Sequence, residues 1–245
     1  MSAAERPPLA GPSAEVQVVR LERGKRPARK RDRVAGEEPL EIRVGGPGEP
    51  FTQVAVTMRT PGADFELAVG FLLTEGLIAE RHDIADIRYC EDVEDATQQY
   101  NVLSVRLARP FDASSLQRNM FASSSCGVCG KASIDMIEVA CRPIPEGPVV
   151  ALDTLLGLPE VLRERQRTFE KTGGLHATGL FTPAGELVEL REDIGRHNAM
   201  DKAIGARLMQ GDAPLHERVA LVSGRAGRSE EHTSELQSRF GISYA

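Results

Sequence analysis

The chain has 245 residues, of which 41% are hydrophobic and 27% are charged, and these proportions are ordinary for a globular protein with a substantial core. A net charge of −6 argues against bulk binding of nucleic acid, and no apolar run approaches the length needed to span a bilayer. Four cysteines and the absence of a recognisable secretory leader favour a reducing compartment, so we expect a cytoplasmic protein.

Residues 1–37 combine prolines with a basic run from Arg20 to Arg33. Such a run suits an acidic partner or phosphates. The segment offers too little apolar surface to order itself, and we therefore expect a disordered basic extension that precedes the main domain over residues 38–227.

The main domain opens with alternating apolar residues over 40–44 and 54–58, which predict a hairpin. Apolar residues then recur at helical spacing from 65 to 73, and this pattern predicts a helix that ends at Gly76. Asp64 or a neighbour is expected to cap its start.

Strands follow near 84–87 and over 100–107, and the second is apolar on both faces, as is typical of a strand inside a sheet. A helical region opens at Asp153, and Pro159 is expected to mark a fresh helix start. The side chains expected on its inward face are Leu155, Leu156, Val161, Leu162 and Phe169.

A second hairpin is predicted over 178–190, followed by a helix through Leu208 and a strand over 219–222. Strands and helices alternate along the chain. This alternation predicts the α/β class, with a central mixed sheet that carries helices on both faces.

Two thiols three positions apart, Cys126 and Cys129, lie in a segment rich in glycine and serine. Gly127 and Gly130 allow the sharp turns that bring both sulfurs to one side, and the charge of Lys131 would lower a thiol pKa. Buried cysteines that pack as small hydrophobes seldom have such neighbours, so the pattern favours chemistry.

Three kinds of chemistry fit this pair. A structural zinc site needs four ligands, whereas Cys90 and Cys141 lie far away in sequence, so a mixed site would have to use His176 or His197. A redox pair of the thioredoxin kind and a persulfide carrier are the other two possibilities.

Residues 228–245 are polar and lack any period, and they resemble the translation of a sequencing-library adapter. We therefore expect this tail to be non-native and the main domain to be incomplete at its C-terminus. A sheet edge left uncovered in this way would favour association.

Five stretches in consistent order resemble one family, the formate dehydrogenase accessory sulfurtransferases. They are RTPG with ELAVGFLLTEG (59–62 and 66–76), CGVCGK (126–131), TGGLHA (172–177), EDIGRHNAMDK (192–202) and SGRA (223–226). The resemblance implies an α/β/α sandwich similar to cytidine deaminases, and a homodimer. It also implies a sulfur carrier that takes persulfide sulfur from a cysteine desulfurase.

On the same resemblance, the sulfur passes to the molybdenum of a bis(molybdopterin guanine dinucleotide) cofactor that is destined for formate dehydrogenase. The resemblance places the persulfide on Cys126 and makes Cys129 the second thiol. This cofactor would be a transient ligand, and no permanently bound cofactor or metal is expected.

A bulky cofactor with several phosphates requires backbone donors and fixed cations. The candidate contacts are Gly173, Gly174, His176, Arg196 and Arg225, with His197 and Lys202 as further cations. His176 also fits a purely structural role, and Arg196 also fits an ion pair with Asp193 at a helix start.

Two other functions remain open from the sequence. A zinc-dependent deaminase needs a His-x-Glu element and a proline before its cysteine pair, but Ala177 follows His176 and Ser125 precedes Cys126. A non-catalytic chaperone would hold the cofactor or the dehydrogenase without moving sulfur.

Overall fold

The computed structural model describes residues 11–90, 100–111, 147–212 and 215–224. Four strands form a mixed sheet in the order β4-β3-β6-β5: β3 (Glu38–Gly45), β4 (Thr52–Arg59), β5 (Ile84–Tyr89) and β6 (Val102–Leu107). β3 and β6 are parallel, whereas the outer pairs are antiparallel. The predicted first hairpin and the interior position of the strand over 102–107 are confirmed.

Three strands form a second sheet in the order β8-β7-β9, which is antiparallel throughout: β7 (His176–Phe181), β8 (Leu187–Asp193) and β9 (Val219–Val222). β7 and β8 are the predicted second hairpin. Because β7 is the central strand, its side chains are buried from Ala177 to Phe181.

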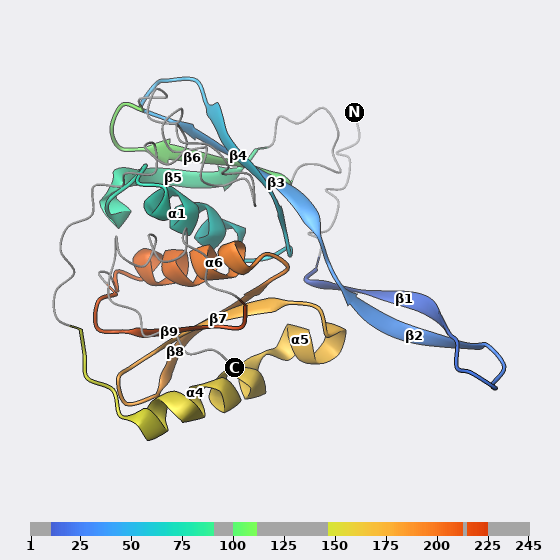
Figure 1. The fold of residues 1–245 in the computed structure, drawn as a ribbon. Coiled ribbons are helices and arrows are strands. Elements are labelled where there is room, and N and C mark those ends of the chain that lie inside the picture. Colours follow the sequence, from blue (N-terminus) through green and yellow to red (C-terminus); the bar gives the residue numbers. More distant parts are fainter. Residues whose placement is uncertain (1–10, 91–99, 112–146, 213–214, 225–245) are drawn as a thin grey trace, which may run out of the picture.

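Two helices, α1 (Asp64–Thr74) and α6 (Arg196–Met209), lie between the two sheets (Figure 1). α4 (Leu152–Arg165) covers the opposite face of the three-stranded sheet and leads into the short α5 (Arg167–Thr172). A single 3-10 turn, η1 (Arg81–Asp83), precedes β5. The three-stranded sheet therefore has helices on both faces.

The α/β class and the mixed sheet are thus confirmed. Strands β3 to β9 are divided between two sheets, and the pair of helices α1 and α6 packs between them (Figure 1). Similarity to cytidine deaminases stays a prediction.

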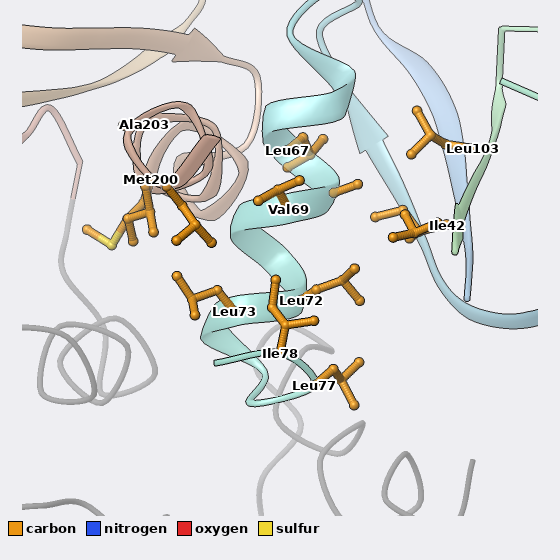
Figure 2. Close-up of a cluster of buried hydrophobic side chains, with 14 of the residues drawn as sticks. Ile42, Leu67, Val69, Leu72, Leu73, Leu77, Ile78, Leu103, Met200 and Ala203 are labelled. Atoms are coloured by element: carbon orange, nitrogen blue, oxygen red, sulfur yellow. The ribbon is translucent and has the colours of Figure 1, made fainter. Parts of the chain in front are cut away.

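The main core lies around α1, which contacts α6 on one side and the mixed sheet on the other (Figure 2). Leu67, Leu72 and Leu103 are almost fully buried in it. A smaller core between α4 and the three-stranded sheet contains Leu158 and Phe181. Burial of these apolar side chains is the main source of stability that holds the layers together.

The two central helices approach so closely that glycine is required at their contact. A Cβ atom on Gly205 of α6 would lie 1.9 Å from the carbonyl oxygen of Glu66, and one on Gly70 of α1 would lie 1.8 Å from that of Asp201. No other residue fits at either position without separating the helices.

The expectation of a disordered extension is wrong for residues 13–35. They form an antiparallel hairpin of β1 (Ser13–Arg20) and β2 (Ala28–Ala35), which extends away from the two-sheet body (Figure 1). Val16 and Val18 lie on one face of the hairpin, opposite Asp32 and Lys30, and are half-buried, and α5 contacts β2. The prolines and the basic run of this segment favoured disorder, so the two short strands were not predicted.

Two expectations for α4 are also wrong. The helix already begins at Leu152, and Pro159 lies inside it and does not start it. The helix continues through the proline because Leu158 and Leu162, on its inner face, pack against the sheet. Leu156 was expected to face inward, but 68% of it is exposed.

Candidate functional site

Three of the stretches that carry the family resemblance meet at one end of the three-stranded sheet. His176 begins β7, Arg196 begins α6, and Gly224 is the second residue after the end of β9. A Cβ atom on Gly224 would lie 3.1 Å from His176 Nδ1 and 3.5 Å from Arg196 Cδ. The backbone at Gly224 is therefore in close contact with both side chains, which we call the His176–Arg196 cluster.

Backbone and hydroxyl groups fix the strand ends that carry this cluster. Ala177 N donates a hydrogen bond to Ser223 Oγ at 2.8 Å, and Ser223 N donates to the carbonyl of Ala177 at 2.9 Å. The serine that precedes Gly224 thus extends the pairing of β7 and β9 up to the cluster. His176 and Gly224 cannot separate without breaking these bonds.

The N-terminus of α6 points its backbone dipole toward the cluster. Gly195 is the N-cap residue and offers no side-chain cap, and the first turn contains no acidic residue. The positive end of a 14-residue helix and the guanidinium of Arg196 both favour an anion.

A buried carboxylate organises the chain just before α6. Asp193 Oδ1 accepts hydrogen bonds from Gly195 N at 2.8 Å and Asn198 Nδ2 at 3.1 Å. Asp193 Oδ2 lies 2.6 Å from Lys202 Nζ, and neither side chain is more than 2% exposed. The partner of Asp193 is thus Lys202 in the second turn of α6, nine residues further along the chain.

The same network reaches the first half of the chain through Thr60. Its backbone N–H donates to Asp193 Oδ2 at 3.1 Å, and its carbonyl accepts from Lys202 Nζ at 2.7 Å. Its hydroxyl accepts from Ile194 N at 3.0 Å. Three bonds from one residue therefore tie the turn after β4 to the turn before α6.

Arg59, the neighbour of Thr60, forms a second buried ion pair. Arg59 Nε and Nη2 donate to the two oxygens of Asp64 at 3.1 and 3.0 Å. Tyr89 Oη also donates to Asp64, at 3.0 Å. Burial and the adjacent Asp64 carboxylate raise the pKa of Tyr89, which keeps its hydroxyl protonated as a donor.

Asp64 does not cap α1 as expected. The N-cap residue is Ala63, in the left-handed region at φ 55°, and no side chain caps this end. The carboxylate of Asp64 is instead fully engaged by Arg59 and Tyr89.

Gly173 and Gly174 lie between α5 and β7 and are exposed. Gly173 adopts φ 68° and ends α5, and its N–H donates to the carbonyl of Phe169 at 2.6 Å. That N–H is therefore already used within the chain. Neither glycine is seen against His176 or Arg196, and their role in cofactor binding stays a prediction.

Cys126, Cys129 and Arg225 lie outside the described residues, although Arg225 directly follows Gly224 in sequence. Cys90 is half-buried. Within the four described ranges, no three His, Cys, Asp or Glu side chains are grouped as a metal site requires.

Sequence reasoning proposed His176 and Arg196 as cofactor contacts, which stays a prediction, and it missed how Gly224 lies against both. It also assigned Lys202 to the cofactor surface, and this assignment is wrong because Lys202 is 1% exposed and paired with Asp193. The available signals were the apolar run over 219–222, which predicts the strand before Gly224, and the opposite charges of Asp193 and Lys202, nine residues apart. Pairing across 142 residues, as between Lys202 and Thr60, leaves no local pattern.

The fold is thus an α/β domain in which glycine-rich strand ends and a helix N-terminus surround a histidine and an arginine. A family model described as the FdhD/NarQ family matches residues 35–229. The chain belongs to this family.

Two relatives support the assignment at high identity. The chain is 48% identical over 217 residues to the sulfur carrier protein FdhD of Streptomyces coelicolor, covering 86% of this chain and 74% of that protein. It is 52% identical over 195 residues to the protein of the same name from Mycolicibacterium paratuberculosis, covering 78% and 70%.

A solved structure has the same fold. The protein is from Desulfotalea psychrophila and is assigned as a formate dehydrogenase accessory protein. It aligns with a TM-score of 0.68 over 95% of this chain and 84% of its own, at 19% identity. Among the helices that the structure describes, none is both long and apolar enough to cross a membrane.

Proposed function

We propose that this protein is a sulfur carrier that accepts persulfide sulfur at Cys126 and delivers it to a molybdenum cofactor. The observation that carries the proposal is the identity of about half of all aligned residues with proteins named sulfur carrier protein FdhD. The matched range 35–229 includes both Cys126 and Cys129.

The first step is a displacement between sulfur atoms. The Cys126 thiolate attacks the outer sulfur of a persulfide on a cysteine desulfurase, and a new S–S bond forms at Cys126. The S–S bond of the donor breaks, and the donor cysteine leaves as a thiolate. The exchange requires no external oxidant or reductant because one persulfide replaces another.

Cys129 offers a route for releasing the sulfur. If its thiolate attacks Cys126 of the persulfide, a Cys126–Cys129 disulfide forms and the outer sulfur leaves as hydrosulfide. The two thiols supply the two electrons that reduce the sulfur. Alternatively, Cys129 donates a hydrogen bond to the persulfide and does not react.

The acceptor is a bis(molybdopterin guanine dinucleotide), which is the substrate of the second step. The His176–Arg196 cluster suits its phosphates, because a guanidinium, an imidazole and a helix N-terminus converge beside a residue without a side chain. Arg225, the next residue after Gly224, would add a further cation. Gly173 and Gly174 are proposed as neighbouring backbone contacts.

Mass spectrometry tests the carrier function directly. The chain is incubated with a cysteine desulfurase and cysteine, and a gain of one sulfur atom at Cys126 is the expected result. Cys126→Ala should abolish the gain, whereas Cys90→Ala should retain it as the matched control. A chain that binds the cofactor but never gains sulfur would be a chaperone, and the proposal would then fail.

The partners that follow from this function are a cysteine desulfurase and a formate dehydrogenase, in the cytoplasm. In cells that lack the native protein, the wild-type chain should restore formate dehydrogenase activity and Cys126→Ala should not. Full activity with Cys126→Ala would place the essential sulfur elsewhere.

A further inference from the structure

The basic hairpin, residues 13–35, carries a charge opposite to that of the rest of the molecule. Residues 11–37 contain eight Lys or Arg and four Asp or Glu, a net charge of +4, while the whole chain carries −6. The remaining residues therefore carry −10. Because the hairpin extends away from the body, the two charges are held apart within one copy (Figure 1).

One face of the basic hairpin combines arginines with apolar side chains. Strand alternation places Arg29, Arg31 and Arg33 on the same face as Val19, which pairs with Arg29. Val19 is 58% exposed and Leu21, in the turn, is 75% exposed. Such a mixture of apolar and basic groups is typical of a docking surface rather than of a solvated ribbon.

Several of these cations have no acidic partner in the structure. Arg31 pairs with Glu15 at 3.2 Å on the surface, and Lys30 lies 3.6 Å from Asp32. For Arg23, Arg26 and Arg29, no ion pair is found among the described residues. Their charge is available to a partner.

A complementary surface lies on α4. Val149, Leu152 and Leu156 are 98%, 69% and 68% exposed, and we call them the α4 stripe. Leu152 and Leu156 are one helical turn apart, so their side chains lie on one face. Exposed Asp153 and Glu160 flank them, and no Lys or Arg occurs between residues 149 and 162.

A hairpin cannot readily cover the α4 stripe of its own chain. β2 contacts α5, which follows the C-terminal end of α4. The stripe lies at the N-terminal end, and the ten residues from Leu156 to Gln166 span about 15 Å of helix. The hairpin also extends away from the body.

We propose that the basic hairpin of one copy docks on the α4 stripe of a second copy. Each copy carries both surfaces, so a two-fold dimer contains the contact twice and leaves neither surface open. Each contact then needs to bury only about half of the roughly 1,600 Å² that stable complexes bury. Val19 and Leu21 cover the leucines, and the arginines face Asp153 and Glu160.

This assignment rests on the described surfaces and is independent of sulfur transfer. It specifies which surfaces join the homodimer that the family resemblance implies. Sedimentation velocity on the full chain at low salt measures the association, and the dimer should weaken as salt is added because exposed charges contribute to it.

The decisive test of this dimer contact uses two charge-reversed variants, measured separately and then mixed. One variant carries Arg29→Glu, Arg31→Glu and Arg33→Glu, and the other carries Asp153→Lys and Glu160→Lys. Each alone should raise the dissociation constant of the homodimer about tenfold or more, since like charges then meet at both contacts. An equimolar mixture should dimerise again, because both contacts of the mixed dimer pair opposite charges.

The matched control reverses charges outside both surfaces, with Asp86→Lys and Arg88→Glu on the exposed face of β5, and should leave association unchanged. Circular dichroism confirms that all variants are folded. A wild-type chain that stays monomeric at low salt would overturn the proposal. So would a dimer that neither reversal weakens, or a mixture that stays monomeric, and in those cases the hairpin would serve an acidic partner of another kind.

Discussion

Lys202 Nζ lies 2.6 Å from Asp193 Oδ2 in the interior of the protein, where each side chain is at most 2% exposed. The pair joins the end of β8 to the second turn of α6, and through Thr60 it also reaches the turn after β4. Both charges are buried, so each depends on the other for compensation.

Removal of one partner should therefore be strongly destabilising. Lys202→Met should lower the free energy of unfolding by about 3–5 kcal/mol, because it leaves Asp193 charged and buried without its cation. Urea unfolding monitored by circular dichroism measures this loss. The double variant with Asp193→Asn should recover part of it, and Lys171→Met, at an exposed site, should cost less than about 0.5 kcal/mol.

A second prediction concerns the contact between α1 and α6. Gly205→Ala should destabilise the protein by about 2 kcal/mol or more, although alanine is the better helix former, because its Cβ would lie 1.9 Å from the carbonyl of Glu66. Gly157→Ala in α4 is the matched control, since a Cβ there meets nothing within 4 Å. The control should stabilise by roughly 0.5–1 kcal/mol. Equal effects of the two changes in thermal unfolding would contradict the close helix contact.

A third prediction concerns pH. Burial raises the pKa of Glu75, at the end of α1, to about 7 from an ordinary value of 4.5. Between these values the folded state binds a proton that the unfolded state has lost, so stability should fall as pH rises through this window. The slope due to this group is at most about 1.4 kcal/mol per pH unit.

Glu75→Gln isolates this contribution. The difference in stability between the variant and the wild type should grow in favour of the variant from about pH 5 to about pH 8, as measured by urea unfolding. A constant difference over this range would mean that the carboxyl titrates normally in the folded protein.

A fourth prediction separates cofactor binding from sulfur loading. Gly224→Ala places a methyl group 3.1 Å from His176 Nδ1 and should weaken binding of the molybdenum cofactor by about tenfold, since overpacking costs roughly 1–3 kcal/mol. Sulfur gain at Cys126 should be unchanged. Gly157→Ala in α4 serves as the steric control, because its Cβ would meet nothing within 4 Å and the residue is not among the proposed cofactor contacts. Cofactor binding unaffected by Gly224→Ala would exclude the His176–Arg196 cluster as a contact.

Most elements of the main domain follow from local patterns. Apolar spacing and turn residues predict the helix from 64 to 74 and the two hairpins of the main domain. The apolar residues on both faces predict the buried strand at 102–107. The division into two sheets was not predictable in this way, because strand order depends on pairings between distant segments such as β3 and β6.

The candidate site shows the same division between local and distant information. A glycine-rich turn before a strand made His176 a candidate, and a helix start made Arg196 a candidate. Their contact with Gly224, and the burial of Lys202, depend on how three distant segments pack. Charge alone could not distinguish the buried Lys202 from the half-buried Arg196, which lies six residues earlier in the same helix.

The placement of α1 and α6 between two sheets also determines what happens if the chain is divided. Residues 11–111 contribute α1 with one sheet, and residues 147–224 contribute α6 with the other, so each fragment made alone would expose the helix surface that its counterpart covers (Figure 2). The smaller core lies within residues 147–224, but neither fragment contains the complete main core. The two should remain unfolded when produced separately and reassemble when produced together, as complementing halves of one cooperative unit.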